Sequence, residues 1–150
     1  MTVDFSYKRA PGYRLATLSR TGGWDEKKLR GQFKALTDWA KEHHVRVSHW
    51  LFFEPNERTF VAAVEFRGKA KGHGKIRVKS VPAATVASVT FDPDVVSPRV
   101  IYHGINDWLK WQKKEKKIRR AVSYREVYGG DPWTDPKVSA RTEIQVVVKK

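Results

Sequence analysis

Two stretches of the chain repeat each other and decide the expected fold: FKALTDW at residues 33–39 and YHGINDW at residues 102–108. Two earlier stretches correspond in the same order, YKRAPGYRLATL at 7–18 and VKSVPAATVASV at 78–89. The offset between the partners is nearly constant. A fixed offset of roughly 70 residues indicates an internal duplication, since self-similarity at a fixed period is typical of repeated units.

Each half shows the same succession of hydrophobic patterns. An alternating segment is typical of a strand, and apolar residues three or four positions apart are typical of a helix. The helical pattern is carried by Leu29, Phe33, Leu36 and Ala40 in the first half and by Ile101, Ile105 and Trp108 in the second. The strand-like segments are 14–19, 49–53 and 59–66, then 85–91, 121–128 and 141–148. Each half is therefore predicted to be a β-α-β-β unit.

The two units predict one α+β domain over residues 1–150, made of two pseudo-repeats at about 1–67 and 75–150. They join most simply into one mostly antiparallel sheet, with two helices on one face and a ligand cleft on the other. The segment RGKAKGHGK, residues 67–75, is too polar for a core and is predicted to be the crossover between the repeats. It lacks the GxxxxGK[ST] pattern of a phosphate loop.

The composition excludes several classes of site. The chain has no cysteine, so disulfides and thiol catalysis are absent. Its five histidines lack a metal-binding spacing, so we predict neither a metal nor a cofactor. A signal peptide and an apolar run long enough for a bilayer are also missing, and we expect a cytoplasmic protein without a membrane partner.

A strong positive charge raises the question of a nucleic-acid partner. The formal net charge is +14, and the run KWQKKEKKIRR at residues 110–120 holds seven basic residues and one acid. Such runs are usually solvated helix ends. Base stacking needs interleaved aromatic residues, and only Trp111 qualifies, so direct nucleic-acid binding stays open as a non-specific contact.

The candidate ligand site centres on YREVYGG, residues 124–130. On a strand, Tyr124, Glu126 and Tyr128 share one face. The corresponding strand of the first half places Trp50 and Phe52 on one face. Ring faces beside a carboxylate suit a cation. The residues alone leave a second interpretation open, in which Glu126 forms an ion pair with one of the thirty basic side chains.

Two further residues near the C-terminus are candidates. Glu143 follows on the last strand, where it is a second candidate acid, an edge-strand charge or an ion-pair partner of Arg141. Trp133, in the loop GGDPWTDP, either covers the site or anchors its loop to the core.

The duplicated order, the segment TGGWDEKKLRGQFKALTDWA and the ending YREVYGGDPWTDPKVSARTEIQVVVKK together resemble the GyrI-like small-molecule-binding domain. The most specific features are Glu126-Val127-Tyr128, Asp131-Pro132 and Thr142-Glu143-Ile144. This family includes effector-binding domains of AraC- and MerR-type transcription regulators as well as stand-alone proteins. The resemblance implies a cleft for lipophilic, often cationic compounds, with Glu126 as the counter-charge.

The resemblance leaves three functions open. The leading prediction is a stand-alone effector-binding protein that binds its ligand without chemistry. A second is a hydrolase of electrophilic toxins with Glu126 and Glu143 as catalytic carboxylates, because one such group could activate water. A third is a module that modulates DNA gyrase or binds another DNA-associated protein.

Overall fold

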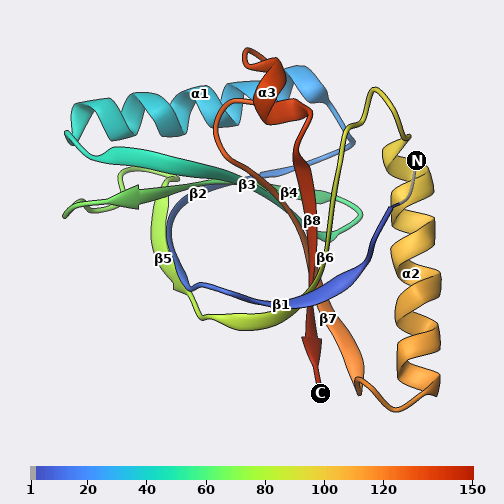
Figure 1. Ribbon diagram of the computed structural model, residues 1–150. Coiled ribbons are helices and arrows are strands. Elements are labelled where there is room, and N and C mark those ends of the chain that lie inside the picture. Colours follow the sequence, from blue (N-terminus) through green and yellow to red (C-terminus); the bar gives the residue numbers. More distant parts are fainter. Residues whose placement is uncertain (1–2) are drawn as a thin grey trace. The chain divides into compact units, whose positions relative to one another are not determined.

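The computed structural model describes residues 3–150 as an α+β fold with two compact units (Figure 1). We call Gly12–Pro82 the first unit, and residues 3–11 together with residues 83–150 the second unit. Within the described residues, each unit combines a long helix with four antiparallel strands. The predicted α+β class and the duplicated β-α-β-β pattern are confirmed.

In the first unit, helix α1 covers one face of a four-stranded sheet. Its elements are β2 (Tyr13–Thr21), α1 (Glu26–Glu42), β3 (Arg46–Asn56), β4 (Thr59–Arg67) and β5 (Arg77–Val81). The strand order is β3-β4-β2-β5, and all neighbours are antiparallel. The helix begins after Asp25, whose carboxylate accepts a hydrogen bond from the Lys28 amide at 3.1 Å. This N-cap bond satisfies one of the unpaired amides of the first turn.

The second unit has the same plan with one additional short helix. Its elements are β1 (Ser6–Ala10), β6 (Ala84–Phe91), α2 (Pro98–Lys114), β7 (Arg120–Tyr128), α3 (Pro136–Ser139) and β8 (Thr142–Lys149). The strand order is β1-β6-β8-β7, again antiparallel throughout. Ser97 is the N-cap residue of α2 but makes no side-chain capping bond. Pro98 fits the first turn because a proline lacks only an amide that would be unpaired there.

Two edge strands exchange places between the repeats. Strand β1 lies in the first predicted repeat but pairs with β6 of the second, and β5 lies in the second predicted repeat but pairs with β2 of the first. The units are therefore divided at Pro11 and Pro82 and are offset from the predicted repeat boundaries. The sequence analysis missed both strands because SYKRA and RVKSV are short and highly charged, with no clear apolar alternation.

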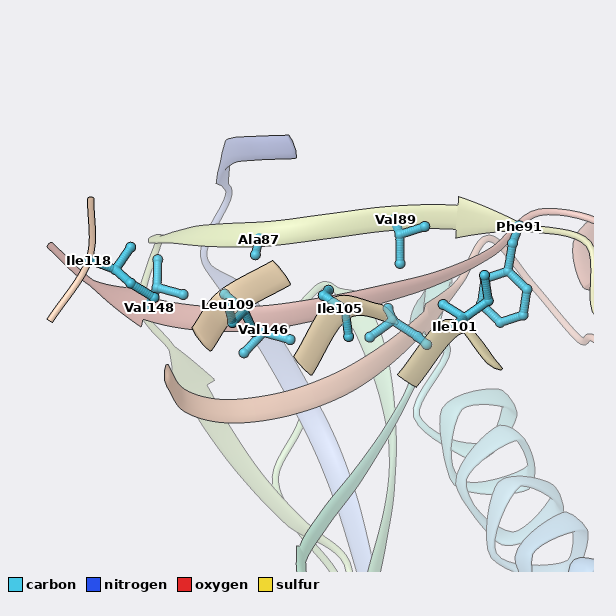
Figure 2. Close-up of a cluster of buried hydrophobic side chains, with 10 residues drawn as sticks. Ala87, Val89, Phe91, Ile101, Ile105, Leu109, Ile118, Val146 and Val148 are labelled. Atoms are coloured by element: carbon cyan, nitrogen blue, oxygen red, sulfur yellow. The ribbon is translucent and has the colours of Figure 1, made fainter. Parts of the chain in front are cut away.

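The core of the second unit lies between α2 and its sheet. The apolar stripe of α2 contacts residues that point from β6 and β8 toward the helix (Figure 2). The cluster consists of Ala87, Val89, Phe91, Ile101, Ile105, Leu109, Ile118, Ile144, Val146 and Val148. These residues define the helix-covered face of this sheet. The predicted helix positions Ile101 and Ile105 are buried, and Trp108 packs against the cluster.

The core of the first unit is richer in aromatic rings. Phe33 of α1 stacks on Trp50 of β3 with ring centroids 4.6 Å apart and planes inclined by 12°. Further along the helix, Trp39 meets Phe66 of β4 edge-on at 5.1 Å. Gln32 is buried in the same layer, where its side-chain amide donates to backbone carbonyls of β2 and β4. These contacts fix α1 on its sheet.

Among residues 3–150, no helix is both long enough and apolar enough to cross a bilayer.

Candidate ligand-binding site

Glu126 lies on β7, where its carboxylate accepts hydrogen bonds from two tyrosines. The Tyr102 hydroxyl, on α2, donates to Oε1 at 2.8 Å, and the Tyr128 hydroxyl donates to Oε2 at 2.6 Å. Tyr128 follows two positions later on the same strand and so lies on the same face. A carboxylate held by two phenol groups is therefore the centre of this site.

The position of Glu126 corrects one expectation. The sequence analysis placed it on the helix-free face of the sheet, but it lies opposite Ile144, a member of the core cluster under α2. Its bond to Tyr102 also comes from that helix. Glu126 consequently lies on the helix-covered face, between β7 and α2. Periodicity identified the residues that share a face, but it could not identify which face the helix covers.

The surroundings of Glu126 also decide between the two interpretations of its charge. Within residues 3–150, no lysine, arginine or histidine forms an ion pair with it. The alternative of an ion pair with a basic side chain is therefore wrong. Burial raises the pKa of Tyr128 well above its ordinary value, and the nearby charge of Glu126 and the hydrogen bond to it raise it further. Tyr128 therefore remains a protonated donor to the carboxylate.

Tyr124 lies at the more exposed end of the same face. Its hydroxyl donates to Oδ1 of Asn106, on α2, at 2.5 Å, and 37 % of the residue is exposed. Three residues of β7 are thus directed toward α2, and two of them bond to it. The predicted group Tyr124, Glu126 and Tyr128 is brought together by the structure.

Glu143 faces the opposite side of the sheet from Glu126. It accepts hydrogen bonds from Ser88 at 2.8 Å and Gln145 at 2.9 Å, and it forms an ion pair with Lys8 at 2.5 Å. Burial raises the pKa of Glu143, but the bonds from Lys8, Gln145 and Ser88 and the charge of Lys8 outweigh it, and the net pKa is lowered. A lowered pKa indicates a carboxylate that stays ionised.

This arrangement changes two expectations about Glu143. Its ion-pair partner is Lys8 and not Arg141, and its strand lies between β6 and β7, so it is no edge-strand charge. Because Glu126 and Glu143 lie on opposite faces of one sheet, they do not form a shared two-carboxylate site. The predicted hydrolytic pair is therefore not assembled in the second unit.

Trp50 and Phe52 belong to the first unit and point toward its own helix-covered layer. Trp50 stacks on Phe33, and Phe52 lies near Phe60, with ring centroids 6.2 Å apart, and meets Trp24 edge-on. Both are thus part of an aromatic core. Their predicted contribution to a pocket with Glu126 stays a prediction.

Trp133 lies in the loop between β7 and α3. Its backbone amide donates to Oδ1 of Asp131 at 2.9 Å, which closes a short turn, and the side chain is half-buried. An aspartate that bonds two residues ahead is a common way to fix a turn. The turn holds Trp133 in a defined place, and its role in covering a ligand stays a prediction.

Sequence reasoning missed Tyr102, which completes the Glu126 site. The repeat offered a signal, because YHGINDW aligns with FKALTDW and matches Tyr102 to Phe33. Phe33 belongs to the apolar stripe of α1, so the alignment places its counterpart on the sheet-facing side of α2. A hydroxyl at that position was the only indication of a polar partner. Metal binding has no comparable support, since residues 3–150 contain no group of three or more candidate ligands.

Comparison with known families identifies the fold. The model of the GyrI-like small molecule binding domain matches residues 4–149. The chain therefore belongs to the GyrI-like family of small-molecule binding domains. A comparison with curated proteins gave no match.

Solved structures agree with this assignment. The C-terminal domain of EcmrR superposes with a TM-score of 0.70 and 17 % identity, over 100 % of this chain and 99 % of that domain. EcmrR in its complex with DNA gives 0.76 and 16 %, over 99 % of this chain but only 58 % of the EcmrR chain. SAV2435 bound to tetraphenylphosphonium gives 0.56 and 10 %, over 97 % and 94 %. The TM-scores show a shared fold, at sequence identities of 10–17 %.

Proposed function

We propose that the chain is an effector-binding protein for lipophilic organic cations, with Glu126 as the counter-charge. One observation carries the proposal. In a chain of net charge +14, Glu126 has no ion pair within residues 3–150 and is held by two tyrosine hydroxyls. Its negative charge is thus positioned beside aromatic rings and is not balanced by a basic side chain of the protein.

The rings of Tyr102 and Tyr128 define the ligand class. A cation bound at Glu126 would be within reach of both rings, and each cation–π contact contributes about 0.5–2 kcal/mol, the larger value in dry surroundings. A small inorganic cation is strongly hydrated and would gain nothing from the apolar surface of the rings. A hydrophobic cation with a delocalised or shielded charge gains from both the carboxylate and the apolar surface.

Two structural relatives support the proposal. SAV2435 was solved with tetraphenylphosphonium, a cation of this class, and it shares the fold. EcmrR was solved on DNA, and this chain corresponds to 58 % of its length. By analogy, the chain would act as the ligand-sensing part of a regulatory system with a DNA-associated partner. This analogy rests on fold alone.

The test compares a charged ligand with a neutral one of similar shape. Tetraphenylphosphonium and triphenylphosphine oxide would be titrated by calorimetry into the wild type, Glu126→Gln and Glu57→Gln. Glu57 is exposed in the β3–β4 turn, so its substitution makes the same change in net charge away from the site. We expect Glu126→Gln to weaken the cation roughly tenfold, equivalent to about 1.4 kcal/mol, and to leave the neutral compound unchanged.

The control separates local from general electrostatics. If Glu57→Gln weakened tetraphenylphosphonium as much as Glu126→Gln, the effect would come from net charge alone and the role of Glu126 would be lost. Equal affinity of the wild type for the charged and the neutral compound would also contradict a counter-charge. Thermal unfolding of each variant would establish that the fold is retained.

A further inference from the structure

A depression of the second unit lies beside the Glu126 site and is lined by charges of the opposite sign. It has a volume of about 380 Å³ and opens between the C-terminal half of α2 and the start of β7. Its lining residues are Asn106, Leu109, Lys110, Lys113, Ile118, Arg120, Ala121 and Tyr124. Ligand pockets commonly start at about 300 Å³, so the space suits one small molecule.

The charged walls of this depression are all positive. Lys110 and Lys113 are three positions apart on α2 and therefore share one face of the helix, while Arg120 comes from the strand side. None of the three forms an ion pair within residues 3–150, and the lining contains no acid. Three exposed cations around one hollow repel each other, and an anion between them would remove that repulsion.

The floor of the depression is apolar, and an aromatic ring stands at its rim. Leu109 and Ile118 are each 5 % exposed and form the apolar part of the lining. Tyr124 stands at the rim, and its hydroxyl is tied to Asn106 at 2.5 Å, which limits the movement of the ring. A fixed and exposed ring is a platform on which a flat group can stack. A bare inorganic anion would leave this platform unused.

We infer that the depression binds a phosphate monoester of a flat aromatic group, the chemical class of the nucleoside monophosphates. A phosphate monoester carries close to two negative charges at neutral pH, which matches several cations better than a carboxylate does. The guanidinium of Arg120 can bind two phosphate oxygens at once, and lysines add point charges. The flat group would then lie against Tyr124 and the apolar floor.

The experiment uses adenosine monophosphate as the probe, with adenosine as the uncharged comparison. Binding to the full chain would be measured at low salt by amide chemical-shift titration. The test variant is Lys110→Gln with Lys113→Gln, and the matched control is Lys114→Gln with Lys117→Gln. The control removes the same charge from exposed residues of the same region that do not line the depression.

We expect the wild type to bind the monophosphate more tightly than adenosine. The test variant should lose roughly tenfold in affinity, or about 1.4 kcal/mol, and the control variant should lose less than about twofold. Arg120→Gln alone should also weaken the monophosphate. The largest shifts should fall on residues 106–113 and 118–124.

Equal losses in the test and control variants would overturn the inference, because they would show attraction by net charge only. Equal affinities for adenosine and its monophosphate would overturn it as well. Tighter binding of a single-stranded oligonucleotide without a terminal phosphate would assign the surface to nucleic acid instead. Lys110→Gln with Lys113→Gln should not weaken tetraphenylphosphonium, and Glu57→Gln should leave monophosphate binding unchanged, so failure here is distinguishable from failure of the proposed cation site.

Discussion

The two units place different chemistry at the same position of a shared plan. In each, a helix covers a sheet, and the second strand of the β-α-β-β repeat pairs with the third, β3 with β4 and β7 with β8. The cross-strand rows are Val89–Ile144–Glu126 in the second unit and Leu18–Ala62–Phe52 in the first. By this register, Phe52 takes the position that Glu126 holds in the second unit.

At the aligned helix position, the residues that the two helices direct at their sheets differ in the same way, apolar in the first unit and polar in the second. Phe33 of α1 stacks on a ring of its sheet, whereas Tyr102 of α2 donates a hydrogen bond to a carboxylate. At this position the first unit therefore has aromatic rings, and the second has a carboxylate. A charge in such a layer costs stability unless it is paired. The rings of the first layer stabilise its fold, and the carboxylate of the second layer is the group to which the proposed function assigns ligand binding.

The largest effect on the free energy of unfolding is expected when a glutamate replaces Phe52 in the first unit. Phe52 is 9 % exposed and packs near Phe60 and Trp24. Phe52→Glu would remove a buried ring and place a carboxylate beside the rings of Phe60 and Trp24, and we expect a loss of about 4 kcal/mol in the free energy of unfolding. Urea denaturation of the variant would measure it.

A matched apolar variant isolates the effect of the charge. Phe52→Leu should cost about 1–2 kcal/mol, since it removes only part of the buried surface. If Phe52→Glu and Phe52→Leu lost the same stability, the first layer would tolerate an acid and the contrast between the units would disappear.

A smaller effect is expected from removing one hydroxyl in the second unit. Tyr102→Phe deprives Glu126 of one donor and should cost about 2 kcal/mol, as hydrogen bonds to charged groups typically contribute 1.5–3 kcal/mol. Tyr7→Phe is the control, because the Tyr7 hydroxyl donates to a neutral acceptor, Gln112, at 3.0 Å. There we expect about 1 kcal/mol.

A double-mutant cycle would test whether the cost of Tyr102→Phe runs through Glu126. In a Glu126→Leu background, the same substitution should cost close to nothing, because the acceptor is gone. If Tyr102→Phe cost the same free energy of unfolding in that background, Tyr102 would act through packing. The hydrogen bond to Glu126 would then contribute nothing to stability.

The sequence predicted the elements and their order because their signals are local. The stripe Leu29, Phe33 and Leu36 identifies α1, and the alternation of Thr85 to Phe91 identifies β6. The duplication then supplied the β-α-β-β plan. Edge strands β1 and β5 depend on pairing with partners more than sixty residues away in sequence, and their own residues carry no apolar pattern.

The site was predictable only in part, for a related reason. Periodicity grouped Tyr124, Glu126 and Tyr128 on one face, and the structure keeps them together. It could not show that α2 covers that face or that Tyr102 supplies a donor, since both depend on tertiary packing. The same limit explains why Glu143 was grouped with Glu126 although they point to opposite faces.

The smallest effect on the free energy of unfolding is expected for the acids on the helix-free faces of the two sheets, where the units again differ. Glu143 pairs with the ammonium group of Lys8, whereas Glu65 of the first unit bonds to the imidazole of His49. We expect Glu143→Gln to cost about 1 kcal/mol or less at pH 7, because Lys8 is nearly half exposed and solvent screens the pair. Urea denaturation of the wild type and the variant would measure the difference.

The pH dependence of that difference gives the sharper test. The pKa of Glu143 is lowered in the folded chain, so the unfolded chain binds a proton more readily. The stabilisation by Glu143 is then complete above its ordinary pKa of 4.5 and is lost as the pH falls through the folded pKa. The gap between wild type and Glu143→Gln should therefore shrink from pH 7 to pH 3, while the gap to the exposed control Glu57→Gln stays small. A gap that is constant over this range would show that the Lys8 pair contributes no net electrostatic stability, and the helix-free faces of the two units would then not differ in this respect.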